Sequence, residues 1–437
     1  MKILCINLPI ERSFYYTMFP YNIASIAALL KEEFDDVSII DLNENRMSFQ
    51  ELKYFFRQNK FDVICLSAMV TQYSFVKRFS FMVKSVSPET KIILGGVLAT
   101  TCKGLIESKT CVDIVYDGVL NKNFIRMIKN NPSYNSNKRV VWCLPDFSSF
   151  NITKYSKNHN LGLKGNSLNI ITSLGCSYNC IFCSSIFSKK VELKPIPVLI
   201  EEIKILMDDF RIKSFIFADE LFLTDFEYVT NLFSSLRDNN ISFPWAAYVR
   251  ADSLDEKKAK FLATNRCKRL FVGFESASQK ILDILRKGYK VEQMQKTVNL
   301  CKKYNISLIS SFIIGSPNET EKDIKLTKKF CLDNNLYPVF NFFTPVPGTA
   351  IYKELIFNNK IKDEENHILS LEDFYSGIPL NLSRMSDDKL VDMKKEIEDE
   401  CETNMKKMNF LKRFSYYYNY MGLKLFKEKI MEWFNII

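Results

Sequence analysis

Three cysteines near the middle of the chain carry the most direct chemical signal in the sequence. Cys176, Cys180 and Cys183 follow an apolar run in a Cys-x3-Cys-x2-Cys arrangement, within the stretch from Ser173 to Ser185. Three thiolates on one tight loop can ligate three irons of a four-iron four-sulfur cubane, and the fourth iron then has no protein ligand nearby. An iron with an open position is a place where chemistry can happen. The spacing therefore predicts an iron–sulfur cluster with a reactive iron.

The same triplet could arise by chance or hold a structural zinc ion. The chain holds 12 cysteines, so three of them could stand together without a shared function. A structural zinc site would need a fourth cysteine or histidine close by, and the next candidates in the sequence are far away. The chain has only two histidines, His159 and His367, which argues against a histidine-rich metal site and against a catalytic triad.

The bulk properties indicate a globular protein of two or three domains. The chain has 437 residues, of which 47% are apolar and 25% charged, enough to bury large cores. No apolar run reaches the length that spans a bilayer, and the first ten residues predict a strand rather than a signal peptide. Many cysteines without a signal indicate a reducing compartment, so we expect free thiols and a cytoplasmic protein. The net charge of +10 permits an anionic substrate or a membrane surface, and we expect no nucleic-acid partner.

Residues 1–140 alternate short apolar strands with amphipathic helices, which is the pattern of a parallel sheet covered on both faces. The expected strands are Lys2–Leu8, Val37–Asp41, Val63–Ser67, Lys91–Leu94 and Ile114–Tyr116. The expected helices are Asn22–Phe34, Phe49–Gln58, Gln72–Val86 and Asn121–Asn130. This alternation predicts a doubly wound, Rossmann-like α/β domain, in which ligands bind beyond the carboxyl ends of the strands.

Two segments at such strand ends are candidates for ligand contact. Ser67 ends the third expected strand, and the pair Gly95-Gly96 follows the fourth. Paired glycines allow a turn with positive φ and the close approach of a large flat or phosphate-bearing ligand. An ordinary tight turn would use the same residues, so the glycine pair alone does not distinguish a ligand site from a turn.

Residues 166–360 repeat the strand–helix alternation six times. The expected strands are Leu168–Ser173, Ser214–Ala218, Ser242–Val249, Arg269–Phe274, Ser307–Ile314 and Val339–Phe343. Six such units predict a partial, TIM-like (β/α)6 barrel with its functional residues at the carboxyl ends of the strands. The cysteine loop follows the first of these strands, and the later strands end in further polar or glycine-containing segments: Asp219 and Glu220, Arg250, Glu275, and Gly315 with Pro317.

The rest of the chain is predicted to form a linker and a helical tail. Residues 141–165 are expected to connect the two domains, and residues 361–437 are expected to be mostly helical. A charged stretch, Asp387–Cys401, predicts a solvated helix, whereas Asn409–Ile437 mixes aromatic with basic side chains. That last segment predicts either a helical cap on the barrel or a helix that makes peripheral contact with a membrane.

Over roughly residues 1–360 the chain resembles radical S-adenosylmethionine (SAM) enzymes that carry a cobalamin-binding domain. The cysteine loop matches their Cys-x3-Cys-x-aromatic-Cys signature, with Phe182 as the aromatic residue. Further matching segments lie in both expected domains: Pro20–Leu30, Phe61–Ser67, Ile92–Gly96, Val112–Gly118, Ile313–Thr320 and Thr344–Thr349. The resemblance implies that the three cysteines hold a four-iron four-sulfur cluster and that SAM chelates its open iron.

The resemblance also implies roles for the other strand-end residues of the barrel. Asp219 and Glu220 stand where these enzymes meet the methionyl amino group, and a charge-assisted hydrogen bond there would fix the sulfonium. The fork of Arg250 suits the methionyl carboxylate. Glu275 is expected to accept hydrogen bonds from the ribose or the amine, and the turn containing Gly315 and Pro317 is expected to contact adenine. Taken one at a time, these residues could equally be a helix-terminal carboxylate, a surface ion pair and a simple turn.

In the first domain the resemblance implies cobalamin at Ser67, Gly95 and Gly96. Two features depart from the pattern of cobalamin proteins. The loop Pro9–Met18 lacks the histidine that ligates cobalt in many of them, as is common in the radical enzymes, and the acidic turn after the fifth strand is reduced to Asp117–Leu120. The cobalamin-binding fold could therefore persist with or without the cofactor.

The leading functional hypothesis is cobalamin-dependent radical methylation of an unactivated carbon. A 5′-deoxyadenosyl radical made from SAM would abstract hydrogen from a small-molecule natural product, a peptide or a lipid, with electrons from flavodoxin or ferredoxin and with oxygen excluded. A radical rearrangement, cyclisation or oxidation is the second hypothesis. The third is a non-catalytic iron–sulfur or cobalamin-binding sensor or partner subunit, and the presence of Asp219, Glu220 and Arg250 counts against it. The sequence does not specify the substrate.

Overall fold

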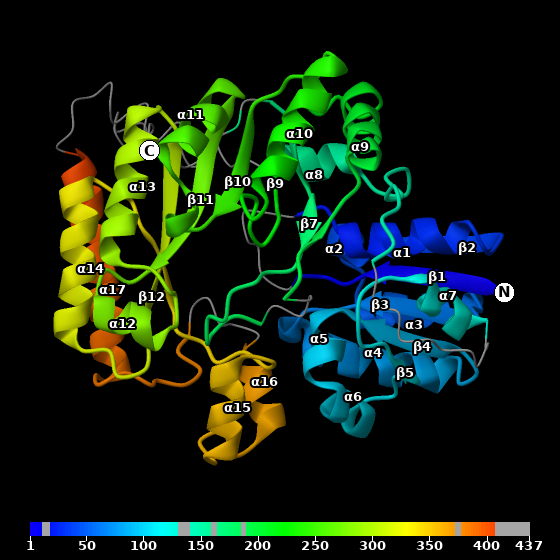
Figure 1. Cartoon of the computed structure of the whole chain (residues 1–437). Helices are drawn as coiled ribbons and strands as arrows, with labels where there is room; N and C mark the ends of the chain where they lie inside the picture. Colours follow the sequence, from blue (N-terminus) through cyan, green and yellow to red (C-terminus); the bar gives the residue numbers. More distant parts are fainter. Residues whose placement is uncertain are drawn as a thin grey trace, which may run out of the picture.

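The computed structural model describes residues 1–10, 18–129, 140–158, 163, 165–184, 189–371 and 377–406. Within these residues the chain forms a five-stranded parallel sheet and a six-stranded parallel sheet, joined by packed helices (Figure 1). A small antiparallel ribbon of β7 (Ser173–Leu174) and β8 (Glu192–Leu193) lies beside the second sheet. The predicted α/β class, with a doubly wound domain followed by a partial barrel, is confirmed.

The first sheet has the strand order β2-β1-β3-β4-β5. Its strands are β1 (Lys2–Asn7), β2 (Asp36–Asp41), β3 (Val63–Ser67), β4 (Lys91–Gly95) and β5 (Ile114–Val115). β1 and β3 are almost entirely apolar because helices cover both faces of a parallel sheet. The chain order reverses between β1 and β3, and that switch point is where doubly wound sheets bind their ligands.

Helices cover the two faces of this sheet in the expected way. One face carries α1 (Tyr21–Lys31) and α7 (Lys122–Ile128), whose apolar residues share a core with Ile3 and Cys5. The other face carries helices that pack on Leu4 and Ile6. These helices are α3 (Phe49–Gln58), α4 (Tyr73–Val86), α5 (Gly96–Thr101) and α6 (Lys103–Lys109), with a short α2 (Leu42–Asn45) and a 3-10 turn at Val70–Gln72.

The second sheet curls into a half-barrel in which strands neighbour one another in chain order. It consists of β6 (Ser167–Ile170), β9 (Ser214–Phe217), β10 (Trp245–Val249), β11 (Cys267–Glu275), β12 (Ser307–Ile314) and β13 (Val339–Phe342). In β12 the residues alternate between buried and half-buried, and the buried Leu308 and Phe312 belong to the outer core. The half-buried set, which includes Ser311, therefore faces the hollow of the half-barrel.

The outer face of the half-barrel is covered by helices that alternate with its strands. These are α9 (Ile196–Asp208), α10 (Phe226–Asp238), α11 (Glu256–Thr264), α12 (Gln279–Ile284), α13 (Val291–Lys303) and α14 (Glu321–Asn334), with a 3-10 turn at Ala251–Ser253. Trp245 is fully buried here, between Phe217 and Phe233.

The segment that connects the two sheets is packed against both of them. It contains α8 (Ile152–Asn158) and, ahead of that helix, Phe147. The ring centroid of Phe147 lies 5.2 Å from that of Phe19 in the first domain and 6.1 Å from that of Phe210 in the half-barrel. Phe150 and Tyr155 complete this aromatic cluster around Phe19. Because these rings are buried, the two sheets share one continuous core on this side.

The helices after the half-barrel return to the first domain. α15 (Ala350–Phe357) is followed by α16 (Glu364–Ser370), which contacts α4 and lies to its lower left in Figure 1. In α16, Glu365 accepts hydrogen bonds of 2.6 Å from both Tyr73 and Lys77, and Ile368 is buried in the core of the first domain.

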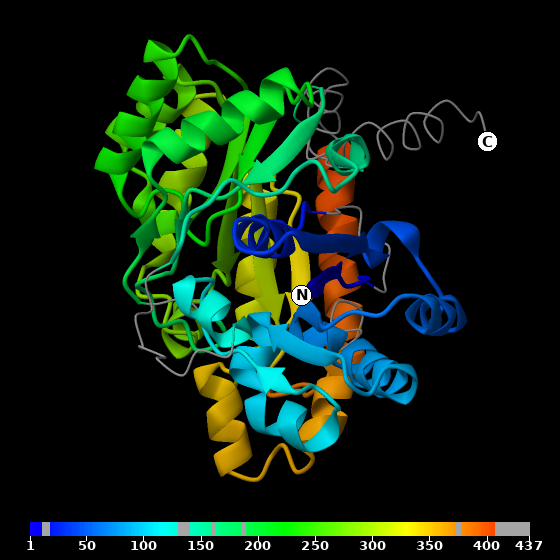
Figure 2. The same ribbon diagram turned by 90° about the vertical axis from the view of Figure 1, so that its right-hand side faces the viewer.

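The charged helix predicted in the tail exists but is not simply solvated. α17 (Asp387–Lys406) runs beside β12, β13 and α14 (Figure 2), and its Leu390, Met393, Ile397 and Cys401 are buried. The expectation of a solvated helix was therefore wrong for this face. The expected cap or membrane helix over Asn409–Ile437 lies outside the described residues. Among the helices that the structure describes, none combines the length and apolar character needed to cross a membrane.

Candidate active site at the facing strand ends

The loop that carries the three cysteines begins at a buried carboxylate. Asp219, at the end of β9, accepts hydrogen bonds from the backbone N–H of Thr172 (2.6 Å) and of Ser173 (3.1 Å), and from the Thr172 hydroxyl. These bonds occupy both of its oxygens, while burial raises the pKa of Asp219 to about 6. Asp219 thus holds the start of the cysteine loop and is not directed at an outside ligand. Its neighbour Glu220 is exposed.

The three thiols lie on the loop at the carboxyl end of β6. Cys176 and Cys180 are half-buried and Cys183 is exposed. Burial is the main cause that raises the pKa of the Cys176 thiol, and the nearby Glu220 carboxylate adds to it. Among the described residues no three His, Cys, Asp or Glu side chains are grouped so that they could hold a single metal ion. A cubane does not require such a group, because each cysteine ligates a different iron, and the donor set on this loop fits that cluster.

Two later segments of the chain fix the middle of the loop. The backbone N–H of Ile181 donates to Leu285 O, and Ile181 O accepts from the N–H of Ile351, both at 3.2 Å. Ile181 belongs to a small apolar cluster with Phe343 and Leu355. The loop therefore packs between α12 and α15 instead of projecting freely into solvent.

Glu275 lies at the end of β11 in a buried ion pair that the sequence did not reveal. Its carboxylate is 2.9 Å from the ammonium of Lys287, and both side chains are less than 10% exposed. The residue has a positive φ of 63°, and its carboxylate folds back over Gly273. A Cβ atom at Gly273 would collide with Oε1 of Glu275, so this arrangement requires glycine there.

Arg250 lies between the end of β10 and the cysteine loop. Its guanidinium forms a two-point contact with Asp252 and approaches the sulfur of Cys180. Two tyrosines, Tyr178 and Tyr289, cover its faces. Neither tyrosine was predicted as a site residue, because nothing in its spacing marks it.

The turn after β12 is held by a buried glutamate. Glu319 accepts hydrogen bonds from the N–H groups of Gly315 (2.6 Å) and Ser316 (3.1 Å), both at Oε2. Gly315 has a φ of 88°, which favours glycine, and Leu390 of α17 packs directly above it. Pro317 follows at the half-buried edge of the turn. The tail reinforces the turn, since the Arg384 N–H donates to Glu319 O at 2.9 Å.

Burial raises the pKa of Glu319 to about 8, which gives a testable pH dependence. Between the ordinary pKa of a glutamate and pH 8, the folded chain holds a proton that the unfolded chain releases, so folding stability falls as the pH rises through this range. Between pH 5 and pH 8, we expect the free energy of unfolding to decline by about 2–4 kcal/mol less in Glu319→Gln than in the unmodified chain. The melting temperature of the variant should decline correspondingly less over this range. Glutamine keeps an oxygen for the two N–H donors. Equal slopes for the two proteins in thermal scans would contradict this prediction.

A cavity of about 440 Å³ lies between the carboxyl ends of the two sheets. The first domain lines it with residues from the ends of β1, β3, β4 and β5, at the switch point of the sheet. The half-barrel contributes Asn169, Ile171, Leu174, Lys194 and Ala218. Leu174 is two residues before Cys176, and Ala218 directly precedes Asp219. The cavity therefore reaches from the first sheet to the cysteine loop.

The predicted residues of the first domain all line this cavity: Ser67, Gly95 and Gly96. At Gly96, with φ 86°, a Cβ atom would lie 2.8 Å from Ala68 O, so only glycine lets the backbone pass there. The remaining lining is mostly apolar, with amide and hydroxyl side chains such as Asn22, which donates to Ser67 Oγ at 2.6 Å. Such a surface fits a flat ring rimmed with amide groups, which is the chemistry of a corrin. The loop that lacks a histidine falls mostly on residues 11–17, outside the described part of the chain.

A buried polar triad at the wall of the cavity was not predicted from the sequence. Glu202 of α9, fully buried, accepts hydrogen bonds from the Tyr21 hydroxyl and from the Lys194 ammonium. Burial, followed by the charge of Glu202, raises the pKa of Tyr21 well above its ordinary value. Tyr21 belongs to the first domain and the other two to the half-barrel, so the triad connects the two domains. Tyr21 and Lys194 both line the cavity.

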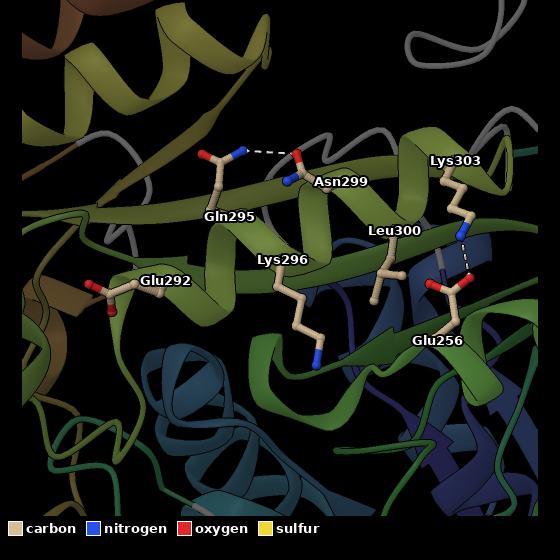
Figure 3. A pocket seen from close by; sticks show the side chains of 7 residues that line it. All are labelled: Glu256, Glu292, Gln295, Lys296, Asn299, Leu300 and Lys303. Carbon is tan, nitrogen blue, oxygen red and sulfur yellow. Dashed lines mark hydrogen bonds and ion pairs between the residues drawn. The ribbon is translucent and has the colours of Figure 1, made fainter.

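A second hollow, on the outer surface, has a different character. Figure 3 shows it along α13, lined by Glu256, Glu292, Gln295, Lys296, Asn299, Leu300 and Lys303. Two pairs of its polar side chains are in contact, Lys303 with Glu256 at 2.5 Å and Gln295 with Asn299 at 3.1 Å. It lies on the helix side of the half-barrel, away from the strand ends, and none of the predicted site residues lines it.

Two family models match the chain. The radical SAM superfamily model matches residues 170–331, which include the cysteine loop and β9 to β12. The B12 binding domain model matches residues 9–119, which include α1 and β2 to β5.

Individual proteins also match over most of their length. An uncharacterized methyltransferase of Pyrococcus horikoshii is 27% identical over 396 aligned positions, covering 82% of this chain and 84% of the relative. The bacteriochlorophyllide d C-12(1)-methyltransferase of Chlorobaculum tepidum is 22% identical, covering 77% and 73%. Among solved structures, the radical SAM methyltransferase TsrM of Kitasatospora setae, with cobalamin and a four-iron four-sulfur cluster bound, superimposes with a TM-score of 0.66 at 15% identity, covering 82% of this chain and 78% of TsrM. At this identity the structural match shows the shared fold.

Proposed function

The chain belongs to the radical SAM superfamily and carries a B12-binding domain ahead of its radical SAM domain, and on this basis we propose that it methylates an unactivated carbon in a cobalamin-dependent reaction. When bound, the cluster, SAM and cobalamin would together supply the electron, the radical and the methyl group. The protein positions these groups and excludes water and oxygen from them.

The observation that carries this proposal is the single cavity shared by the two domains. Its walls combine the glycine turn of the first sheet with Leu174 and Ala218, which flank the cysteine loop and the Asp219–Glu220 pair. A cofactor seated on Gly96 would therefore face the open side of the cluster loop. Methyl transfer from one cofactor to a radical generated at the other requires this proximity.

Within this proposal each strand-end residue has a defined task. Cys176, Cys180 and Cys183 hold the cluster, and Asp219 holds the start of their loop through Thr172 and Ser173. The exposed Glu220, which acts electrostatically on Cys176, is the better-placed acceptor for the methionyl ammonium.

Two further sets of residues, at the ends of later strands, are assigned to other parts of the bound SAM. The buried Glu275–Lys287 pair offers a carboxylate and an ammonium for the polar groups of the bound SAM. The turn of Gly315 and Pro317, held by Glu319, is assigned to adenine.

The names of the relatives reported above support methyl transfer. Two of them are named as methyltransferases, one acting on a bacteriochlorophyllide, and TsrM is a methyltransferase as well. We assign a small organic substrate and a low-potential electron donor of the flavodoxin or ferredoxin type to this chain, and no nucleic acid.

The experiment that tests the proposal needs no knowledge of the substrate. The chain is reconstituted without oxygen with iron, sulfide and cobalamin, then mixed with SAM and a low-potential reductant. We expect methylcobalamin and S-adenosylhomocysteine in equal amounts, together with slow formation of 5′-deoxyadenosine. 5′-Deoxyadenosine without S-adenosylhomocysteine would reject methyl transfer in favour of rearrangement, cyclisation or oxidation. If neither product forms, the proposal that this chain is an enzyme is wrong.

A glycine outside the cavity provides a control for the role of cobalamin in the same assay. Gly96→Ala would place its Cβ 2.8 Å from Ala68 O, whereas a Cβ at Gly104, an exposed glycine of α6 that does not line the cavity, would meet no atom within 4 Å. Gly96→Ala should therefore lose bound cobalamin, seen in its visible spectrum, and lose S-adenosylhomocysteine formation while still making 5′-deoxyadenosine. Gly104→Ala should retain both. Equal cobalamin content in the two variants would show that this turn does not bind the cofactor.

A further inference from the structure

Arg250 makes a contact with the cysteine loop that its expected role does not explain. Its Nη1 lies 3.8 Å from the sulfur of Cys180, in hydrogen-bonding geometry for sulfur. Arg250 was expected to bind a carboxylate of the ligand, but the structure directs one side of its fork at a residue proposed to ligate iron. The rest of its surroundings shows how firmly this orientation is fixed.

The guanidinium is held from several directions. Nε and Nη2 donate to the two carboxylate oxygens of Asp252 at 2.9 and 3.1 Å, and Nη2 also donates to the backbone carbonyl of Lys287. Its Cζ atom lies 3.5 Å from the ring centroid of Tyr178 and 5.2 Å from that of Tyr289.

These contacts leave Arg250 little freedom to bind anything else. The side chain is 6% exposed, and four of its five N–H groups have partners among the described residues. An arginine with this many partners is preorganised and does not swing out to meet a substrate.

A fixed N–H donor beside a cluster sulfur has a known physical effect. Reduction adds one negative charge to an iron–sulfur cluster, and hydrogen bonds to its sulfurs together with nearby positive charge stabilise the reduced form. The carboxylate of Asp252 compensates part of the charge of Arg250 at longer range, but the N–H group that points at Cys180 still acts locally.

We propose that Arg250 is a positioning residue that sets the reduction potential of the cluster through Cys180. This inference rests on the proposed function, since it requires Cys180 to hold the cluster. The two tyrosines and Asp252 hold the guanidinium in this orientation, and the backbone carbonyl of Lys287 accepts a further hydrogen bond from it. Arg250 thereby makes the cluster easier to reduce than the same cysteine loop would be on its own.

The test is a redox titration of the reconstituted cluster, followed by electron paramagnetic resonance, without added SAM. Arg250→Gln removes the positive charge, and Arg250→Lys keeps the charge but loses the planar fork. The matched control is Arg266→Gln, which alters an exposed arginine at the opposite end of β11 whose Nη1 donates to Ser242. Iron and sulfide content per chain is measured for every sample.

We expect wild-type iron content in all variants and a lower midpoint potential in Arg250→Gln. The reduction equilibrium should fall at least tenfold, which corresponds to about 59 mV for one electron. Arg250→Lys should shift less in the same direction, and Arg266→Gln should not shift. A wild-type potential in Arg250→Gln would overturn the proposal. If that variant holds no cluster, Arg250→Lys decides, and an unchanged potential there would overturn it. A failure of the unmodified chain to assemble any cluster would instead refute the proposed function.

Discussion

A chain with Cys180 replaced by alanine is expected to form 5′-deoxyadenosine only at the background rate of the reagents. Cys180 is one of three thiols on the loop, and the structure places the guanidinium of Arg250 against its sulfur. The loop is fixed on both sides of Ile181, so it cannot rearrange to bring a substitute ligand. Loss of one ligand should leave a labile cluster of lower iron content, and the electron that cleaves SAM would then have no source.

The measurement pairs iron and sulfide analysis with the product assay, under strict exclusion of oxygen. Cys111→Ala is the matched control, because Cys111 is also a free, half-buried cysteine but lies in the first domain. It should keep a full cluster and a wild-type rate. A Cys180→Ala chain that retained both would exclude Cys180 as a ligand and with it the proposed cluster loop.

The second large effect is expected at the buried triad between the domains. Glu202→Ala would leave the Lys194 ammonium, 2% exposed, without its counter-charge, and the Tyr21 hydroxyl without its acceptor. Breaking a buried ion pair from one side costs about 3–5 kcal/mol. The melting temperature should therefore fall by about 3–5 °C. Cobalamin retention should fall with it, because Tyr21 and Lys194 both form the cavity wall.

Glu201→Ala is the control for this change, since Glu201 is the exposed neighbour on the same helix and should alter neither quantity. The double variant Lys194→Met with Glu202→Leu removes both charges and should recover much of the lost stability, because apolar replacement of a buried pair is often neutral or favourable. A wild-type melting temperature for Glu202→Ala would show that the triad makes no net contribution to the stability of the fold.

Most strands of both sheets could be predicted from the sequence alone. β3 and β12 have the predicted bounds, and α3 begins where a Ser48–Glu51 capping box starts it. These elements have strong local signals, namely continuous apolar runs bounded by turns and a capping pair three residues apart. The apolar stripe of α17, by contrast, was present at i, i+3 and i+7 but was obscured by the many charged residues around it.

That the three cysteines lie on one loop could also be predicted, because they are neighbours in the sequence. The polar groups that hold the site in place could not be predicted from the sequence. Glu202 meets Tyr21 across 181 residues, and Lys287 meets Glu275 only because β11 ends in a positive-φ turn. Asp219 had a visible signal, but sequence cannot distinguish a carboxylate that binds a ligand from one that binds the backbone of the next loop. The two demand the same residue type at the same strand end.

Two separate sets of polar contacts connect the first domain to later parts of the chain: the Tyr21–Glu202–Lys194 triad, and the hydrogen bonds that Glu365 of α16 accepts from Tyr73 and Lys77. The two sets act like the two halves of a bivalent ligand. When one set breaks, the other set and the connecting chain keep the separated groups at a high effective concentration, of millimolar order for a short tether, so the broken contacts form again quickly. Full separation of the domains would require both sets to break at the same time. Exchange of large molecules with the cavity should therefore be slow and should pass through one edge at a time.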